Sequence, residues 1–149
     1  QEFTSVERLP DAHKIVCAPF EQAISQLVIH SGTYVVIVTR GHHHDERVLE
    51  LVLKSDAKYI GMIGSRRKVM VIRDHLIQQG VDDRRLAQVH APIGYPIGAE
   101  TPEEIGISIV AELISVRRKK DVTLNPVNVK EGRNDERVLT GGAFDSFPI

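Results

Sequence analysis

Tryptophan is absent from this chain of 149 residues, and aromatic residues make up only 5% of it. Proteins that bind single-stranded nucleic acid stack the bases on aromatic side chains, so this composition argues against that class. The formal net charge of -1 argues equally against nucleic-acid binding through a general excess of positive charge. We therefore expect no nucleic-acid partner, and we expect function to reside in local clusters of residues.

Cysteine is almost absent too, because Cys17 is the single one and can form no internal disulfide. The sequence also lacks a long uninterrupted apolar segment, a signal-peptide pattern and a charged amphipathic anchor. These absences argue against a membrane partner and favour a reduced, cytoplasmic setting. A hydrophobic fraction of 42% is nevertheless enough for one core, so one compact domain is expected.

Short β-branched runs alternate with segments of helical periodicity as far as about residue 120. The pattern predicts strands at residues 13–17, 34–39 and 57–63, and a shorter one at 86–90. It predicts helices at residues 20–30, 45–54 and 66–79, the last closed by Gly80, and a further helix that begins at Pro102. The chain therefore consists of repeated strand–helix units.

Apolar residues fall on one side of each expected helix, which predicts the buried faces. These residues are Phe20, Ala23, Ile24, Leu27 and Val28, then Val48, Leu49, Val52 and Leu53, then Val69, Ile72, Leu76 and Ile77, and finally Ile105, Ile109, Ala111, Leu113 and Ile114. The last helix should begin with a capping box, with Thr101 as N-cap, Pro102 in the first position and Glu104 in the third. Four cations at residues 117–120 should lie at its C-terminus, where they complement the helix dipole.

Buried strands that are joined by helical crossovers predict a parallel sheet with helices on both sides. The expected fold class is therefore α/β, a Rossmann-like three-layer sandwich with a parallel sheet, over residues 1–120. From residue 121 to 149 the pattern fails, because proline, glycine and asparagine interrupt a polar stretch. This irregular tail is expected either to be loose or to dock on a neighbouring chain.

Residues 59–68 combine a buried strand, a glycine turn, a helix N-cap at Ser65 and three successive cations. Free backbone N–H groups and the positive end of the helix dipole both favour an anion at such a position. Cations at a helix N-terminus are disfavoured by the dipole, so their presence favours a bound ligand over a plain turn with exposed cations. Gly64, Ser65, Arg66 and Arg67 are therefore predicted to bind a phosphate.

The loop after residues 34–39 contains Arg40, Gly41 and three consecutive histidines that begin at His42. Gly41 permits a tight exit from the strand, and Arg40 can reach an anion. A metal site made by the three histidines is disfavoured, because consecutive side chains point in different directions. Asp45 is predicted to be the N-cap of the next helix, with a catalytic acid or base as the alternative.

Residues 90–100 form a third loop that is unusually apolar and rich in proline and glycine. The loop is either a rigid turn that packs on the sheet or a ligand contact, and His90 is either a hydrogen-bonded core histidine or a site residue. In open parallel sheets the ligand crevice lies at the carboxyl ends of the strands, so all three loops should border it. No catalytic triad or pair of acids is evident, so binding is expected rather than catalysis.

In this order, the three loops resemble the xanthine dehydrogenase accessory family (XdhC/CoxI), in its C-terminal Rossmann domain. The matching motifs are TRGH (residues 39–42), YIGMIGSRRK (59–68), HAPIG (90–94) with IGA (97–99), and TPEEI (101–105). The resemblance covers about residues 7–119.

That resemblance implies an accessory or maturation factor, a chaperone more than a catalyst. Such a factor binds molybdenum cofactor (molybdopterin), supports its sulfuration and delivers it to a molybdenum hydroxylase such as xanthine dehydrogenase, with a cysteine desulfurase as a further partner. The phosphate or pyrophosphate of the cofactor suits the helix start at Ser65. The implied cofactor-binding residues are Arg40, Gly41, His42, Gly64, Ser65, Arg66, Arg67, His90 and Gly94.

The chain departs from the family pattern at its beginning, since the usual glycine-rich first strand-turn-helix and the strand after it are missing. The family's N-terminal domain, with its cysteine, is missing too; Cys17 falls in a predicted strand and should be a small buried hydrophobic residue. We interpret the chain as N-terminally truncated: a fragment, a processed product, or a chain that another polypeptide completes. It would expose an edge strand and apolar helix faces, so self-association as a homo-oligomer is expected.

Two other functions stay open. The first is an NAD(P)-dependent oxidoreductase, which the fold permits, although no G-x-G-x-x-G loop precedes a helix in this sequence. The second is a protein-interaction module, in which Arg66, Arg67 and Lys68 meet an acidic surface instead of a phosphate.

Overall fold

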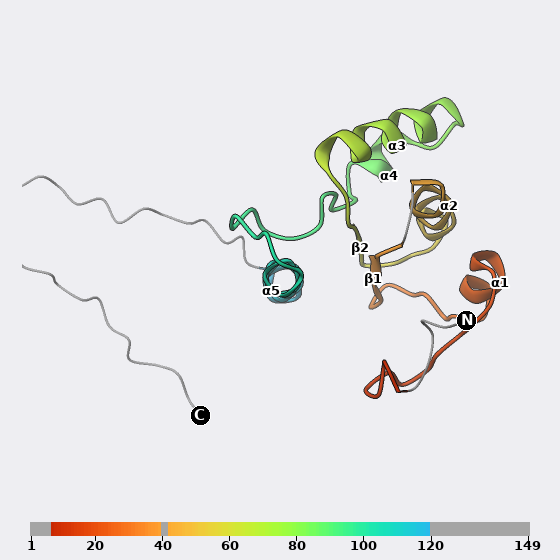
Figure 1. Ribbon diagram of the computed structural model, residues 1–149. Helices are drawn as coiled ribbons and strands as arrows, with labels where there is room; N and C mark the ends of the chain where they lie inside the picture. Colours follow the sequence, from red (N-terminus) through yellow and green to blue (C-terminus); the bar gives the residue numbers. More distant parts are fainter. Residues whose placement is uncertain (1–6, 40–41, 120–149) are drawn as a thin grey trace, which may run out of the picture.

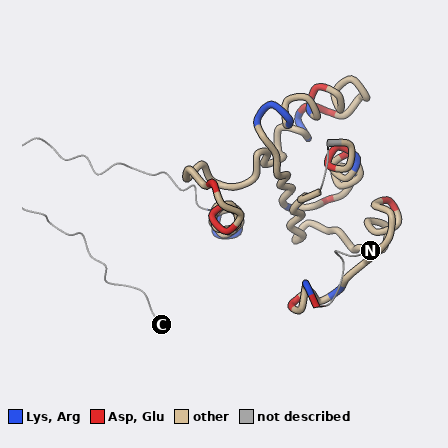
Figure 2. Tube along the Cα trace, viewed as in Figure 1, with Lys and Arg blue, Asp and Glu red and all other residues tan. Residues whose placement is uncertain are grey.

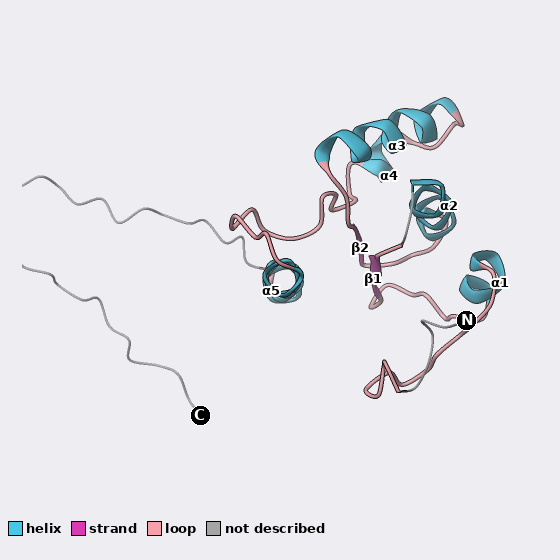
Figure 3. Ribbon diagram, in the orientation of Figure 1, coloured by secondary structure: helices cyan, strands magenta, loops and turns pink. Residues whose placement is uncertain are grey.

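The computed structural model describes residues 7–39 and 42–119; Arg40, Gly41 and the expected tail lie outside the described residues. The elements follow one another along the chain as helices and two short strands (Figure 3). Their bounds are α1 Phe20–Ser25, β1 Tyr34–Ile37, α2 His42–Leu53, β2 Tyr59–Met62, α3 Arg66–Gln78, α4 Asp83–Leu86 and α5 Pro102–Arg118.

The sheet is parallel. Strand β1 pairs with β2, with Tyr34 opposite Tyr59 and Ile37 opposite Met62. A parallel bridge joins Gly61 of β2 to His90, so the chain after α4 runs along the other side of β2. Strand β2 is therefore central, and all its residues are buried, whereas β1 lies at the edge of the described sheet and is only partly covered.

Helices lie on both sides of this sheet. Figure 1 shows α1, α2 and α3 on one side and α5, seen end-on, on the other. Parallel strands need a crossover connection, and α2 supplies it between β1 and β2. The three layers confirm the predicted Rossmann-like α/β fold.

The apolar core lies between the sheet and the helices α2 and α3. It contains Ile37, Ile60 and Met62 from the strands and Val48, Leu49, Val52, Leu53, Ile72 and Leu76 from the helices. The predicted inward face of α2 is thus confirmed. On α3 the prediction was wrong for Ile77, which is exposed because it lies about 100° around the helix from the fully buried Leu76.

The N-terminal predictions were partly wrong. Residues 13–17 form no strand, and Cys17 is exposed rather than buried. No strand of the described sheet lies beside this run, so its backbone has no ladder to join. Helix α1 is also shorter than expected and ends at Ser25, which leaves Leu27 and Val28 exposed.

Residues 86–90 were wrongly predicted as a strand. A short helix, α4, ends at Leu86, and of this run His90 makes the bridge to the sheet. The cause is a capping signal: the side chain of Asp82 accepts a hydrogen bond from the backbone N–H of Arg84 at 2.9 Å.

Helix α5 begins as predicted. The Thr101 hydroxyl accepts from the backbone N–H of Glu104 at 3.3 Å, and the Glu104 carboxylate accepts from the N–H of Thr101 at 3.0 Å. Its buried side differs from the prediction, because its fully buried residues are polar: Ser108, Glu112 and Ser115. Ile114, which was expected inside, is exposed. None of the helices within residues 7–39 and 42–119 is long and apolar enough to cross a membrane.

Candidate functional site

A groove of about 440 Å³ lies at the carboxyl end of β2, between the start of α3 and the loop before α5. Ile63, Gly64 and Arg66 form one wall, and residues 92–99 form the other. Ile105 and Ser108 of α5 complete the lining. The structure thus brings the second and third loops together at the expected edge of the sheet.

The start of α3 supplies the cationic side of the groove. Ser65 is the N-cap, as predicted, and its hydroxyl accepts from the backbone N–H of Lys68 at 3.2 Å. Arg66 and Arg67 are exposed, and neither forms an ion pair within the part of the chain that the structure describes. Figure 2 shows these cations at the first turn of α3. Arg66 lines the groove, so it is placed to meet an anion there.

Lys68, the third cation of the motif, is engaged inside the protein instead. Its ammonium group pairs with the carboxylate of Asp45, and the two side chains are 14% and 0% exposed. Thr39 donates its hydroxyl to the same carboxylate at 2.5 Å. Asp45 therefore ties the end of β1 to the first turn of α3.

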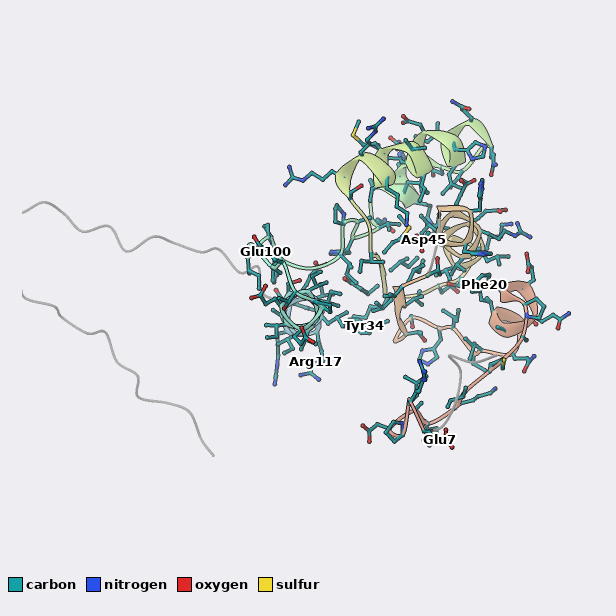
Figure 4. All side chains as sticks on the ribbon, in the orientation of Figure 1. Glu7, Phe20, Tyr34, Asp45, Glu100 and Arg117 are labelled. Atoms are coloured by element: carbon teal, nitrogen blue, oxygen red, sulfur yellow. The ribbon has the colours of Figure 1, made fainter. Side chains whose placement is uncertain are left out.

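The prediction that Asp45 is an N-cap was wrong. Helix α2 already begins at His42, so Asp45 lies within its first turn. Figure 4 shows Asp45 in the interior of the molecule, beside α2. Its carboxylate accepts hydrogen bonds from Lys68 and Thr39.

The first loop is only partly described. Arg40 and Gly41 lie outside the described residues, as does the side chain of His42. His43 and His44 are exposed on α2, and the His44 ring lies 5.4 Å from the ring of Phe20. Among the described residues, no three His, Cys, Asp or Glu side chains come close enough together to hold a metal ion.

Gly94 holds the third loop against α5. Its φ is 96°, and a Cβ atom at this position would lie 2.4 Å from the Ser108 hydroxyl oxygen. Only glycine allows both this backbone conformation and this approach. The N–H of Gly94 donates to Glu112 Oε2 at 2.6 Å, so the loop is fastened to the helix at the border of the groove.

Glu112 is the centre of a polar cluster between α5 and the sheet. Besides Gly94, it accepts from the Tyr59 hydroxyl at 2.8 Å and lies 2.5 Å from Nδ1 of His90. Glu112 is 8% exposed and His90 is 41% exposed, with the His90 ring 4.5 Å from that of Tyr59. Burial, and then the hydrogen bond to Glu112, raise the pKa of Tyr59. His90 is thus hydrogen-bonded beneath α5 and does not line the groove.

Sequence reasoning missed the two carboxylates that organise these loops, Glu112 and the inward-facing Asp45. A signal for Glu112 was present: it lies four residues after Ser108 and three before Ser115, so all three share one side of α5. If that side of α5 faces the sheet, its carboxylate is buried and must be hydrogen-bonded. For Asp45 the partners are 6 and 23 residues away, and only the fold brings them together.

The groove can bind an anion at one end and a flat apolar group along its length. Arg66 and the first turn of α3 supply N–H donors. Isoleucine and proline side chains and Tyr95 supply the apolar wall. Most small-molecule sites combine such walls with a few well-placed polar groups.

Comparisons with known proteins agree with this arrangement. The sequence model of the XdhC Rossmann domain matches residues 1–113. The uncharacterized protein YqeB of Escherichia coli (strain K12) is 38% identical over 98 residues, which are 66% of this chain and 18% of YqeB. A probable xanthine dehydrogenase subunit from Bacillus subtilis (strain 168) is 30% identical over 112 residues, 74% of this chain and 31% of that protein.

A solved structure shares the fold. The crystal structure of a xanthine dehydrogenase from Bacillus halodurans superposes with a TM-score of 0.67 and 28% sequence identity, over 84% of this chain and 35% of that one. The chain therefore spans between 18% and 35% of the length of these relatives. Because the family match covers more than half of its residues, the chain belongs to the XdhC Rossmann domain family.

Proposed function

We propose that the chain is the ligand-binding part of an accessory factor for a xanthine dehydrogenase-type molybdenum hydroxylase. In this role it binds molybdenum cofactor, supports its sulfuration, in which a cysteine desulfurase is the sulfur-supplying partner, and supports its insertion into the hydroxylase. The observation that carries the proposal is the groove with Arg66 at its border, in a chain of the XdhC family. The name of the Bacillus subtilis relative supports the link to xanthine dehydrogenase.

The residues of the groove fit a molybdopterin. Its phosphate suits the donors at the start of α3, and its flat ring system suits the apolar wall of residues 92–99. Arg40, Gly41 and His42, at the end of the neighbouring strand, are proposed to border the ligand from the other side. The cofactor itself supplies the molybdenum chemistry; the residues of this chain bind it and exclude water.

The lining of the groove favours holding a ligand over transforming it. Among its described residues, the polar side chains are those of Arg66, Tyr95 and Ser108, and none is a carboxylate, a histidine or a thiol. A general acid or base working near neutral pH is usually one of those groups. This is the reason for proposing a chaperone and not a catalyst.

The anion end of the groove can be tested with Arg66→Ala/Arg67→Ala. We expect the affinity for molybdenum cofactor, and the competition by inorganic phosphate, to fall by about tenfold or more, because each guanidinium contributes charged hydrogen bonds of at least ~1.5 kcal/mol. Binding is measured by fluorescence, and helical circular dichroism should be unchanged. The matched control is Arg84→Ala/Arg118→Ala, which removes two exposed cations elsewhere and should leave the affinity unchanged.

Other outcomes separate the alternatives. An unchanged affinity in the first variant contradicts the anion site. An equal loss in the control indicates general attraction between charges, as in an interaction module, and this loss should then vanish at high salt. Binding of NAD(P)H in place of molybdenum cofactor would favour the oxidoreductase.

A further inference from the structure

Helix α3 carries an exposed row of alternating cationic and apolar side chains. The row consists of Arg66, Met70, Arg73 and Ile77. Spacings of four, three and four residues place these side chains on one side of the helix. Met70 is 64% exposed and Ile77 is exposed too, and Figure 1 shows α3 on the outside of the molecule.

A hollow of about 280 Å³ lies beside this row. Its lining includes the exposed Met70 and Arg73 and the buried Ile72 and Leu86. Arg73 is the single polar side chain among the described residues that line it. Small-molecule sites combine an apolar wall with several converging polar groups, so this hollow fits apolar side chains of another protein better than a small ligand. We call the row and the hollow the α3 surface: Arg66, Met70, Ile72, Arg73, Ile77 and Leu86.

The α3 surface lies in a cationic region, although the chain as a whole is slightly anionic. Residues 66–86 contain six Lys or Arg and three Asp, a local net charge of +3 against -1 for the whole chain. Arg66 and Arg67 form no ion pair within the described part of the chain. The Arg73 guanidinium meets Asp83 at 2.5 Å, but its side chain is 49% exposed, so N–H donors remain for a second carboxylate. An apolar segment that carries carboxylates is therefore the complementary partner.

The spacing of the apolar residues favours a helix as the shape of that segment. Amphipathic helices bind grooves through anchors that recur at three, four and seven residues. Met70 and Ile77 lie seven residues apart, which is roughly 10 Å along α3, or two turns. A helix that lies along α3 can contact both with side chains from one of its faces.

We propose that the α3 surface binds an acidic amphipathic helix of the molybdenum hydroxylase that receives the ligand of the candidate site. Arg66 begins the row and also lines the groove of that site, so a protein docked on α3 lies next to the groove. A ligand that leaves the groove then has a short path into the docked protein. The identity of the partner rests on the proposed function, whereas the docking of an acidic helix rests on the α3 surface alone.

A second copy of the chain fits the α3 surface less well. A two-fold pair uses the same patch on both molecules, so it would bring two sets of the same cations into one interface. Like charges that face each other across an interface weaken it.

Two neighbouring residues provide a matched test of the contact. Met70 and Val71 are 64% and 62% exposed, but Val71 lies about 100° around the helix and does not line the hollow. Binding of the full chain to a cofactor-free hydroxylase of the xanthine dehydrogenase type is measured by biolayer interferometry. Met70→Asp should weaken it by about tenfold or more, because a carboxylate replaces an apolar contact and faces the acidic helix, and Val71→Asp should change it by less than about twofold. Circular dichroism should show that both variants keep their helices.

The charge of the partner is tested separately. Arg73→Glu should weaken binding by about tenfold, whereas Arg118→Glu, at the end of α5 on the other side of the sheet, should not. Binding of the wild type should also weaken as the salt concentration rises.

Photo-crosslinking identifies the bound segment. Cys17→Ser/Met70→Cys carries the reagent on the α3 surface, and Cys17→Ser/Val71→Cys is the control. Mass spectrometry should find the crosslink from position 70 in a segment of the hydroxylase whose apolar and acidic residues recur at helical spacing.

Three results would overturn the proposal: no binding of the hydroxylase, an equal loss in Met70→Asp and Val71→Asp, or crosslinks from position 70 to a second copy only. The docking and the proposed function fail in different ways. A chain that binds molybdenum cofactor but no hydroxylase contradicts the docking. A chain that docks through Met70 but binds no molybdenum cofactor contradicts the proposed function.

Discussion

The two faces of the sheet are held by different forces. On the α2 and α3 side, Ile60 and Met62 pack against Ile72 and Leu76, and the contact is almost wholly apolar. On the α5 side, Tyr59 donates its hydroxyl to Glu112, and Nδ1 of His90 lies 2.5 Å from the same carboxylate. Apolar packing is non-directional and stabilises the fold, whereas hydrogen bonds fix orientation. The groove lies between these two kinds of contact. The wall formed by the start of α3 belongs to the helix that packs in the apolar core, and the wall formed by residues 92–99 is held by the hydrogen bond of Gly94 to Glu112.

The largest effect on stability is expected for the ion pair between Asp45 and Lys68, which joins α2 to α3 on the apolar side of the sheet. Asp45→Asn should lower the free energy of unfolding by about 3–5 kcal/mol, because it leaves the largely buried ammonium group of Lys68 without its partner. The double variant Asp45→Asn/Lys68→Met should regain most of this loss, since it removes both charges. Urea unfolding measures both. A single variant as stable as the wild type would show that the pair contributes little.

The second largest effect on the free energy of unfolding is expected when a buried apolar side chain is shortened. Leu76→Ala should cost about 3 kcal/mol, because Leu76 is fully buried in the core and its truncation leaves a cavity. Ile77→Ala, at the exposed neighbouring position, should cost less than about 1 kcal/mol. Equal costs in thermal or urea unfolding would mean that α3 is rotated about its axis relative to this structure.

The polar side can be tested with two stacked tyrosines. Tyr59 and Tyr34 lie 5.7 Å apart, but the Tyr59 hydroxyl donates to Glu112 while the buried Tyr34 hydroxyl has no partner among the described residues. Tyr59→Phe should therefore cost about 2 kcal/mol, and Tyr34→Phe about 0.5 kcal/mol or less. A larger cost for Tyr34→Phe would indicate a partner outside the described residues.

The smallest effect concerns alkaline pH. The pKa of Tyr59 is raised in the folded state, so the folded protein keeps this proton while the unfolded chain loses it near pH 10. The stabilisation is fully present below about pH 10 and is lost above it, by up to about 1.4 kcal/mol per pH unit. Urea unfolding at about pH 9 and about pH 11 should show a smaller loss in Tyr59→Phe than in the wild type. Identical losses would contradict the role of this proton.

Much of the fold could be predicted because local signals agree with the tertiary structure. The caps at Ser65 and Thr101 and the apolar face of α2 each depend on nearby residues, and each was found. Residues 13–17 failed because a strand exists only where another strand lies beside it, and residues 86–90 failed because the cap at Asp82 begins a short helix there. A short apolar run does not reveal its neighbour.

The candidate site was predictable in outline, since the loops after parallel strands must meet at one edge of the sheet. Gly64, Arg66 and Gly94 do meet at the groove. The roles of Lys68 and His90 depend on Asp45 and Glu112, which come from other elements of the chain. Sequence spacing carries no information about such long-range pairs, so the internal ion pair of Lys68 could not be predicted.

Cys17 has a practical consequence for any study of assembly. It is the single thiol of the chain and it is exposed, so under oxidising conditions two molecules can be linked covalently at this point. Such a linked pair would imitate self-association in gel filtration, and a reducing agent or Cys17→Ser would remove it. The same thiol offers one defined attachment point for a fluorescent dye.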